Sequence, residues 1–324
     1  MKKVFSLTVA LILFIMLFAT TLSTGLAAAE PDRKLKVAYT TMTFGAPYFV
    51  EVGNGIKEAG EELGWEVTLH DGKMDVATQI AALETYIAQD YDLIFLSAVD
   101  GAACAPLVKQ AADKGIPTVT EATKVDGTAA HVGPGEWDMG YALGTGAGKW
   151  CQDNLQGDIK VTTFGVINDP YTLEREVAMR AGIEEVYQNG NVIYINEAGT
   201  IQGLTPEDGI KNMEGILQSN PDINVIMGCN DDSIMGAYEA AKTANMDLSK
   251  MCFGGVNAIA QAIDLIKSEK AANSGAYRIT IDIIPFETGR ICVDIGKRVL
   301  EGEEFTEPQL IPVKQVTWDT IDNY

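Results

Sequence analysis

The sequence predicts an α/β protein with two similar lobes, each built on a doubly wound parallel sheet, and three observations lead to this prediction. Short β-branched runs alternate with longer stretches of helical period, which is the pattern of β-α units in a parallel sheet. This series begins at Leu35 and starts again near Val161. The chain has 324 residues, more than one ordinary core holds, and no long Gly/Ser linker divides it.

The first series supplies the elements of an amino-terminal lobe. Its strand segments are short and apolar or β-branched, and its helical segments repeat apolar residues at three- and four-residue spacing. In chain order we expect strand 35–41, helix 48–63, strand 66–69, helix 76–89, strand 93–96, helix 103–114 and strand 118–120.

The second series repeats the layout of the first. A helix end, a polar turn, a buried strand and a polar residue follow one another in segment 87–98 and again in segment 216–230. Because open parallel sheets bind ligands at the carboxyl ends of their strands, two such lobes facing each other make a cleft. In chain order we expect strand 161–166, helix 173–188, strand 192–195, helix 206–218, strand 225–227, helix 233–244 and strand 252–254.

The charge balance excludes one class of partner. Lys and Arg number 24 against 45 Asp and Glu, a formal net charge of −21. A polyanion would be repelled by this charge and would not find the basic stripe that it needs. We therefore expect no nucleic-acid partner.

The amino terminus has the layout of a secretory signal. Two lysines at 2–3 precede an apolar run over 4–19, and alanines at 27–29 supply the small-residue cleavage pattern before Glu30. A membrane anchor is the alternative, but the run is at the short end of spanning length and no basic cluster follows it. We expect a cleaved signal peptide over 1–29, no lipid anchor because no Cys is nearby, and a periplasmic or secreted protein.

The cysteines and histidines lack metal-site spacing. No CxxC motif occurs, and there are only two histidines, so a zinc site is not predicted and we expect no metal. An oxidising compartment would permit disulfides, but several cysteines lie in apolar runs, which favours buried free thiols. The five cysteines are Cys104, Cys151, Cys229, Cys252 and Cys292.

Catalytic signatures are missing from the sequence. No GxSxG elbow, P-loop or HExxH occurs, and no GxGxxG follows the first strand. The glycine-rich segment 144–148 lies inside a helical pattern, which favours close helix packing over phosphate binding. We therefore expect a protein that is not an enzyme and needs no cofactor.

Polar and aromatic residues gather instead at strand ends and at the starts of the following helices. A sugar offers hydroxyls at its edge and apolar C–H groups on its face, so carboxylates, amides, Arg and aromatic rings suit it. The candidate ligand-binding residues are Tyr48, Phe49, Ser97, Glu121, Trp137, Arg175, Asn230, Asn257 and Asp282.

Several segments together resemble the type I periplasmic sugar-binding proteins, the ribose-binding protein-like family of ABC transporter substrate-binding proteins. Segments 40–49, 62–65 and 114–119 are similar to the amino-terminal lobe of that family. Segment 229–237, which reads Cys-Asn-Asp-Asp-Ser-Ile-Met-Gly-Ala, resembles its N-D-x-x-A/M-x-G-A motif. The resemblance covers nearly the whole chain after the signal.

The resemblance implies the periplasmic binding protein-like I fold, with two lobes joined by a three-segment hinge. The crossings are expected near 133–135, 283–285 and 311–313. The implied domains are a signal peptide at 1–29, an amino-terminal lobe of 30–134 plus 285–311, and a carboxyl-terminal lobe of 135–284 plus 312–324.

The resemblance also assigns roles in the amino-terminal lobe. Tyr48 and Phe49 occupy the aromatic pair that stacks on the sugar ring, although a hydrophobic staple at the helix start is the alternative for Phe49. Glu121 stands where the family has an Asp followed by Arg, and Ala122 replaces that Arg. Ser97 is smaller than the Asn often found in its place, which implies room on one side of the site.

In the carboxyl-terminal lobe the resemblance points to Asn230 and Arg175. Asn230 matches an amide that bonds a ring hydroxyl, and its alternative role is to cap the following helix, a role that Asp231 fits better. Arg175 can donate hydrogen bonds to two hydroxyls at once, or can form a salt bridge with Glu174 or Glu176.

Of three further candidates, Asp282 and Trp137 lie near the crossings. Asn257 stands where the family commonly has Asp. Asp282 lies beside the position where the family has a polar ligand-binding residue near the hinge, and Ile283 is the alternative residue for that position. Trp137 either lines the cleft or seals the hinge.

The implied function is an extracytoplasmic solute-binding protein that captures a small sugar or polyol by hinge closure. It would act as a monomer and deliver its ligand to the membrane permease of an ABC importer. The alternative is a periplasmic receptor that presents a sugar-like signal to a sensor kinase or chemoreceptor. A cytoplasmic repressor core shares the fold, but it would carry a basic helix-turn-helix where this chain has a signal.

Overall fold

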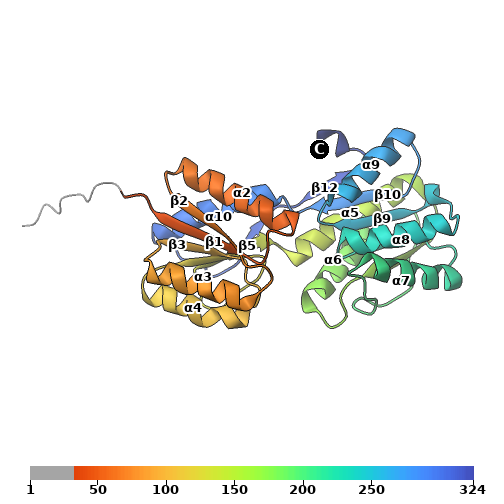
Figure 1. Ribbon diagram of the computed structural model, residues 1–324. Helices are drawn as coiled ribbons and strands as arrows, with labels where there is room; N and C mark the ends of the chain where they lie inside the picture. Colours follow the sequence, from red (N-terminus) through yellow and green to blue (C-terminus); the bar gives the residue numbers. More distant parts are fainter. Residues whose placement is uncertain (1–32) are drawn as a thin grey trace, which may run out of the picture.

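The computed structural model describes residues 33–324, and these form two lobes that lie side by side (Figure 1). The predicted signal peptide lies outside the described residues. One lobe contains β1 (Lys36–Thr41), α2 (Pro47–Glu62), β2 (Glu66–Asp71), α3 (Val76–Ala88), β3 (Leu93–Leu96), α4 (Gly101–Asp113), β4 (Thr118–Glu121), β5 (Ala130–Pro134), α10 (Pro285–Leu300) and β11 (Gln309–Ile311).

The other lobe is formed mostly by the middle of the chain. It contains α5 (Glu136–Asn154), β6 (Ile159–Phe164), α6 (Pro170–Val186), β7 (Val192–Tyr194), α7 (Pro206–Ser219), β8 (Val225–Gly228), α8 (Asp231–Thr243), η1 (Leu248–Lys250), β9 (Cys252–Val256), α9 (Ala260–Ala272), β10 (Tyr277–Asp282), β12 (Lys314–Thr317) and η2 (Ile321–Asn323). We call the two units the N-lobe and the C-lobe.

Each lobe has one sheet of six strands, and the two sheets have equivalent orders. The N-lobe order is β11-β5-β4-β3-β1-β2, and the C-lobe order is β12-β10-β9-β8-β6-β7. All pairs are parallel except β10 with β12, which is antiparallel. The predicted fold class, with two similar doubly wound lobes, is confirmed.

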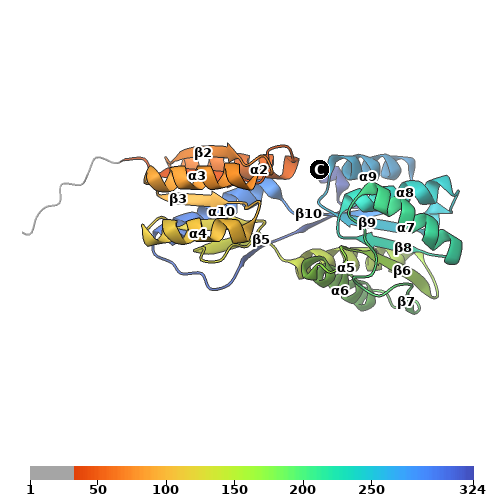
Figure 2. The same ribbon diagram turned by 60° about the horizontal axis from the view of Figure 1, so that its bottom comes forward.

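Helices cover both faces of each sheet (Figures 1 and 2). In the N-lobe, α2 and α10 pack over one face and α3 and α4 over the other, and β3 is buried along its whole length. In the C-lobe, α5 and α6 cover one face, and α7, α8 and α9 cover the other. The two cores of each lobe are therefore separated by its sheet, as expected for doubly wound folds.

The close packing of α5 on α6 depends on the glycine-rich segment. A Cβ added at Gly144 would lie 2.0 Å from the carbonyl oxygen of Met179 on α6. A Cβ at Gly140 would lie 2.1 Å from the carbonyl oxygen of Arg175. The packing role predicted for segment 144–148 is confirmed at Gly144, and Gly140 has the same role.

Three crossings join the lobes, as predicted. The chain passes between them after β5, between β10 and α10, and between β11 and β12. Along the described chain, no helix or strand of one lobe packs extensively against an element of the other. The lobes are thus joined mainly through these short segments, an arrangement that permits rotation about them (Figure 2).

All five cysteines are buried and none is bonded in a disulfide. The interpretation as buried free thiols is confirmed. Burial raises the pKa of Cys229 to about 11, so this thiol is protonated and unreactive at neutral pH.

Candidate functional site

Chain direction determines where the candidate residues lie. β5 and β10 each end directly at a crossing, so their carboxyl ends point toward the other lobe. The neighbouring parallel strands end at the same edge of each sheet. Polar groups that follow these strands therefore lie on the side where the two lobes approach each other.

At this edge of the N-lobe, the Glu121 side chain is 1% exposed. Its Oε1 accepts a hydrogen bond of 2.5 Å from the Tyr48 hydroxyl, and its Oε2 accepts one from the Ser97 hydroxyl. Ser97 Oγ lies 3.0 Å from the Tyr39 hydroxyl. Burial raises the pKa of Glu121 above its usual value, and the hydroxyl donors oppose this shift.

The backbone turns directly after Glu121, the last residue of β4. Ala122 has a φ of 58°, a left-handed conformation, and the Thr123 N–H donates back to the Glu121 carbonyl at 2.7 Å. Neither Ser97 nor Glu121 is accessible in this arrangement. Direct contact of these two residues with a ligand stays a prediction.

Tyr48 and Phe49 form an aromatic pair at the start of α2. Their ring centroids lie 5.1 Å apart in an edge-to-face arrangement, and both side chains are half-buried. Burial and the nearby Glu121 raise the pKa of Tyr48 well above its ordinary value. Ala46 is the N-cap of the helix, and the stacking role of the pair stays a prediction.

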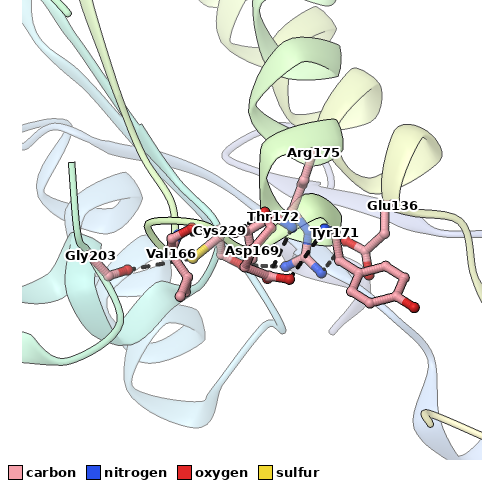
Figure 3. A network of polar contacts seen from close by, with 8 residues as sticks. All are labelled: Glu136, Val166, Asp169, Tyr171, Thr172, Arg175, Gly203 and Cys229. Atoms are coloured by element: carbon pink, nitrogen blue, oxygen red, sulfur yellow. Dashed lines mark hydrogen bonds and ion pairs between the residues drawn. The ribbon is translucent and has the colours of Figure 1, made fainter. Parts of the chain in front are cut away.

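Arg175 reaches from α6 to two groups of the C-lobe (Figure 3). Its Nε donates to Glu136 Oε2 at 2.8 Å, its Nη2 lies 2.6 Å from the same oxygen, and its Nη1 donates to the Cys229 carbonyl. The predicted alternative partners, Glu174 and Glu176, are wrong. Glu136 is the partner because it begins α5, which packs along α6.

Glu136 is a residue that sequence reasoning missed as part of this site. Burial raises its pKa, and the Arg175 guanidinium opposes that shift. Tyr171 was also missed, and its side chain is 54% exposed beside this ion pair (Figure 3). The sequence held one signal for each of them. Glu136 is an acidic residue just after a predicted crossing, and Tyr171 is an aromatic residue one helical turn before Arg175.

A local network holds the start of α6 in place. Asp169 is its N-cap and accepts from the N–H groups of Tyr171 at 3.3 Å and Thr172 at 3.2 Å. The Val166 N–H donates to Thr172 Oγ1 at 3.0 Å (Figure 3). Arg175 therefore projects from an anchored helix start.

Asn230 caps α8, which corrects the expectation that Asp231 fits this role better. Asn230 Oδ1 accepts from the Ser233 N–H at 3.0 Å and from the Ser233 hydroxyl at 2.9 Å. Its Nδ2 donates to the Leu204 carbonyl at 2.8 Å. Both ends of the amide are thus engaged within the lobe, and the side chain is buried.

Asp231 is a fully buried carboxylate of the C-lobe. Oδ1 accepts from the Tyr277 hydroxyl at 2.8 Å, while Oδ2 accepts from Thr280 Oγ1 at 2.9 Å and from the Ile259 N–H at 3.0 Å. Burial raises its pKa to about 7 despite these donors. The carboxylate fixes the loop that presents Asn257, whose side chain is exposed and whose φ is 106°.

Asp282 lies at the second crossing. Its Oδ1 accepts from the Ile284 N–H at 2.7 Å, and its Oδ2 accepts from the Tyr324 hydroxyl. Ile284, the N-cap of α10, has a φ of 42°, which is costly for a β-branched residue. In this arrangement both carboxylate oxygens of Asp282 are bonded at the crossing, so the side chain is not free to bind a ligand.

Trp137 is 44% exposed and stacks over Tyr141, with ring centroids 6.4 Å apart and an interplanar angle of 17°. It therefore does not seal the hinge in this arrangement. The residue lies in the first turn of α5, directly after the first crossing.

Two kinds of feature are absent from residues 33–324. No group of three or more His, Cys, Asp or Glu side chains is placed to hold a metal ion. No helix in this range combines the length and apolar character needed to cross a bilayer.

Comparisons with known proteins agree with this architecture. The ribose import binding protein RbsB of Bacillus subtilis is 25% identical over 327 residues, covering 98% of this chain and 99% of that protein. The solved structure of a periplasmic ribose ABC transporter from Conexibacter woesei has a TM-score of 0.75 at 23% identity, over 90% of this chain and 94% of that one.

A solute-binding protein of an ABC transporter from Bacillus halodurans, solved with bound myo-inositol, has a TM-score of 0.68 at 20% identity, over 91% of this chain and 98% of that one. The family model for the periplasmic binding protein domain matches residues 37–304. Members of this family are substrate-binding proteins of transporters and not enzymes. The chain therefore belongs to the periplasmic binding protein family, as the resemblance of its motifs to the type I sugar-binding proteins indicates.

Proposed function

We propose that this protein captures a small sugar or polyol between its lobes and delivers it to the permease of an ABC importer. The observation that carries the proposal is the placement of aromatic and polar groups at the facing edges of two lobes that are not packed together. A ligand that touches both edges would stabilise the closed arrangement, and a permease could distinguish that arrangement from the open one.

The relatives support a sugar or polyol as the ligand class. One is named for ribose import, and one structural neighbour was solved with myo-inositol. The chain adds its own support, because Tyr48 and Phe49 offer aromatic faces and Arg175 offers planar N–H donors. The contacts of Arg175 in the described chain engage one N–H on each nitrogen, so two of its five donors remain for ligand hydroxyls.

The remaining expectations are part of the same proposal. The lobes comprise 30–134 plus 285–311 and 135–284 plus 312–324, and a signal peptide over 1–29 directs export without a lipid anchor. The protein acts as a monomer.

Mass spectrometry of the exported protein tests the signal peptide. It should find a start near Glu30, and retention of residues before Ala27 would contradict the signal-peptide proposal.

A thermal-shift screen tests the ligand class. D-ribose, D-allose, myo-inositol and xylitol are each added to the purified protein, with amino acids of similar size as controls. A compound present at 100 times its Kd stabilises the folded state by about 2.7 kcal/mol. A shift with an amino acid and none with any sugar or polyol would contradict the proposal.

Small-angle scattering then tests closure. The compound that gives the largest thermal shift should lower the radius of gyration at saturation, because the lobes approach each other about the three crossings. A profile unchanged by a compound that binds would argue against hinge closure.

A further inference from the structure

We propose that Glu121 acts on ligand binding through Tyr48, as a positioning residue that does not touch the ligand. The inference rests on the proposed function, because it concerns the same interlobe site. It starts from the burial of Glu121 and from the hydroxyl groups that surround its carboxylate.

Both carboxylate oxygens of Glu121 are already engaged inside the N-lobe. Oε1 accepts from Tyr48 on α2, and Oε2 accepts from Ser97 after β3. With 1% of the residue exposed, a ligand has no access to either oxygen in this arrangement. The carboxylate therefore joins α2 to two central strands of the sheet.

The protons of the cluster can be accounted for one by one. An ionised carboxylate only accepts, so Ser97 and Tyr48 must donate to Glu121. The Ser97 proton is then used, and Tyr39 donates to Ser97 Oγ. Each of the three hydroxyls has one proton and each proton has one acceptor. The only proton of the Tyr48 hydroxyl is thus directed inward, toward Glu121.

This direction leaves the ring of Tyr48, and not its O–H, as the surface offered to a ligand. The ring is held at two points, by its hydroxyl on Glu121 and by the edge-to-face contact with Phe49. A ring held before binding avoids the ordering cost of an aromatic side chain on association. Loss of the tether should weaken binding by about 2- to 10-fold.

A double-mutant cycle separates positioning from direct contact. Glu121→Gln keeps the shape of the side chain but cannot accept from Tyr48 and Ser97 with both of its terminal atoms. Affinity for D-ribose and myo-inositol is measured by calorimetry in Glu121→Gln, Tyr48→Phe and the double variant. We expect Glu121→Gln to weaken binding in the parent and to have little further effect beside Tyr48→Phe, which has no hydroxyl to hold. An equal loss in both backgrounds would show direct contact and overturn the proposal.

The matched control is Glu269→Gln in the C-lobe. Glu269 is also buried and accepts a 2.5 Å bond from a tyrosine hydroxyl, that of Tyr238. It lies near the carboxyl end of α9 and accepts from the Tyr277 N–H at the start of β10, the end of that strand away from the interlobe edge. This variant should lower thermal stability and leave affinity unchanged. A matching loss of affinity in the control would assign the effect of Glu121→Gln to general destabilisation, against the proposal.

A second readout needs no ligand and no Glu121 variant. With ring-labelled tyrosine, NMR reports how fast the Tyr48 ring reorients, and we expect faster reorientation in Ser97→Ala, which loosens the carboxylate, than in the parent. A Tyr48 ring equally mobile in both would overturn the proposal. If neither D-ribose nor myo-inositol binds the parent, the ligand choice fails, while this measurement still tests the positioning role.

Discussion

Glu121 in the N-lobe and Asp231 in the C-lobe are both buried carboxylates at the edge that faces the other lobe, but they hold different parts of the structure. Glu121 of the N-lobe is bonded to side-chain hydroxyls and holds the side chain of Tyr48. Asp231 of the C-lobe also accepts from the Ile259 backbone and so holds a loop. The comparison suggests that the N-lobe presents a positioned aromatic face, and the C-lobe presents polar groups on a fixed backbone.

The lobes also differ in whether an arginine lies at the edge that faces the other lobe. The C-lobe edge contains Arg175, paired with Glu136, whereas Ala122 stands in the N-lobe where the related family has an arginine. Pairing with Glu136 orients the guanidinium and offsets its charge. An anionic ligand would therefore gain little, which agrees with a neutral sugar or polyol.

The largest expected effect is the loss of the C-lobe carboxylate. Asp231→Ala leaves the Tyr277 and Thr280 hydroxyls and the Ile259 N–H without their acceptor, and should lower the free energy of unfolding by about 3–5 kcal/mol. Chemical denaturation measures the change. Asp232→Ala is the control, because the described contacts include no hydrogen bond from its side chain, and a similar loss there would contradict the role given to Asp231.

The pH dependence of stability tests the same carboxylate. Its folded pKa of about 7 lies above the ordinary value of 3.8 for an aspartate, so the folded state binds its proton more tightly than the unfolded state. The contribution of Asp231 to stability is therefore fully present below about pH 4 and is lost as pH rises toward 7. Tyr277, Thr280 and neighbouring Asp232 are the groups that face it.

Asp231→Asn should flatten this part of the stability profile between pH 4 and 7, as measured by denaturation at each pH. An unchanged slope in the variant would show that other groups produce it. The comparison with Glu121→Gln then reports whether the N-lobe carboxylate, whose pKa burial also raises, behaves in the same way.

A smaller effect is expected for Asn230→Ala. Removal of the cap and of the bond to the Leu204 carbonyl should cost about 1–2 kcal/mol of stability. Affinity for a binding sugar should stay nearly intact, because both ends of the amide already have partners within the lobe. Thermal melting beside calorimetric titration measures both quantities, and a large loss of affinity in a stable variant would restore Asn230 as a ligand group.

The smallest effect is expected for Tyr324→Phe, which removes the hydroxyl bonded to Asp282 at the second crossing. The bond is partly exposed, so stability should change by less than about 1 kcal/mol. A change in the ligand-free radius of gyration would show that this bond biases the lobe arrangement. Tyr141→Phe is the matched control, since its hydroxyl bonds Glu185 within the C-lobe.

The sequence by itself determined the architecture of this protein. The alternation of strand and helix patterns predicted four of the six strands of each sheet, and β3 lies in the range expected for it. These features are local, because burial on one or both faces imposes a period on the residues of a single element. The strands β5, β10, β11 and β12, which adjoin the crossings, were not predicted from the pattern, and the crossings themselves were expected only from the family resemblance.

The sequence also determined which residue types stand at the strand ends, but only the tertiary structure decided which of them face outward. Ser97, Glu121 and Asn230 are turned inward by partners on other elements. Arg175 pairs with a residue 39 positions away that no local pattern connects to it. The physical reason is that a polar side chain at a strand end can bond inward or face the other lobe, and the choice depends on donors and acceptors brought close only by the packed fold.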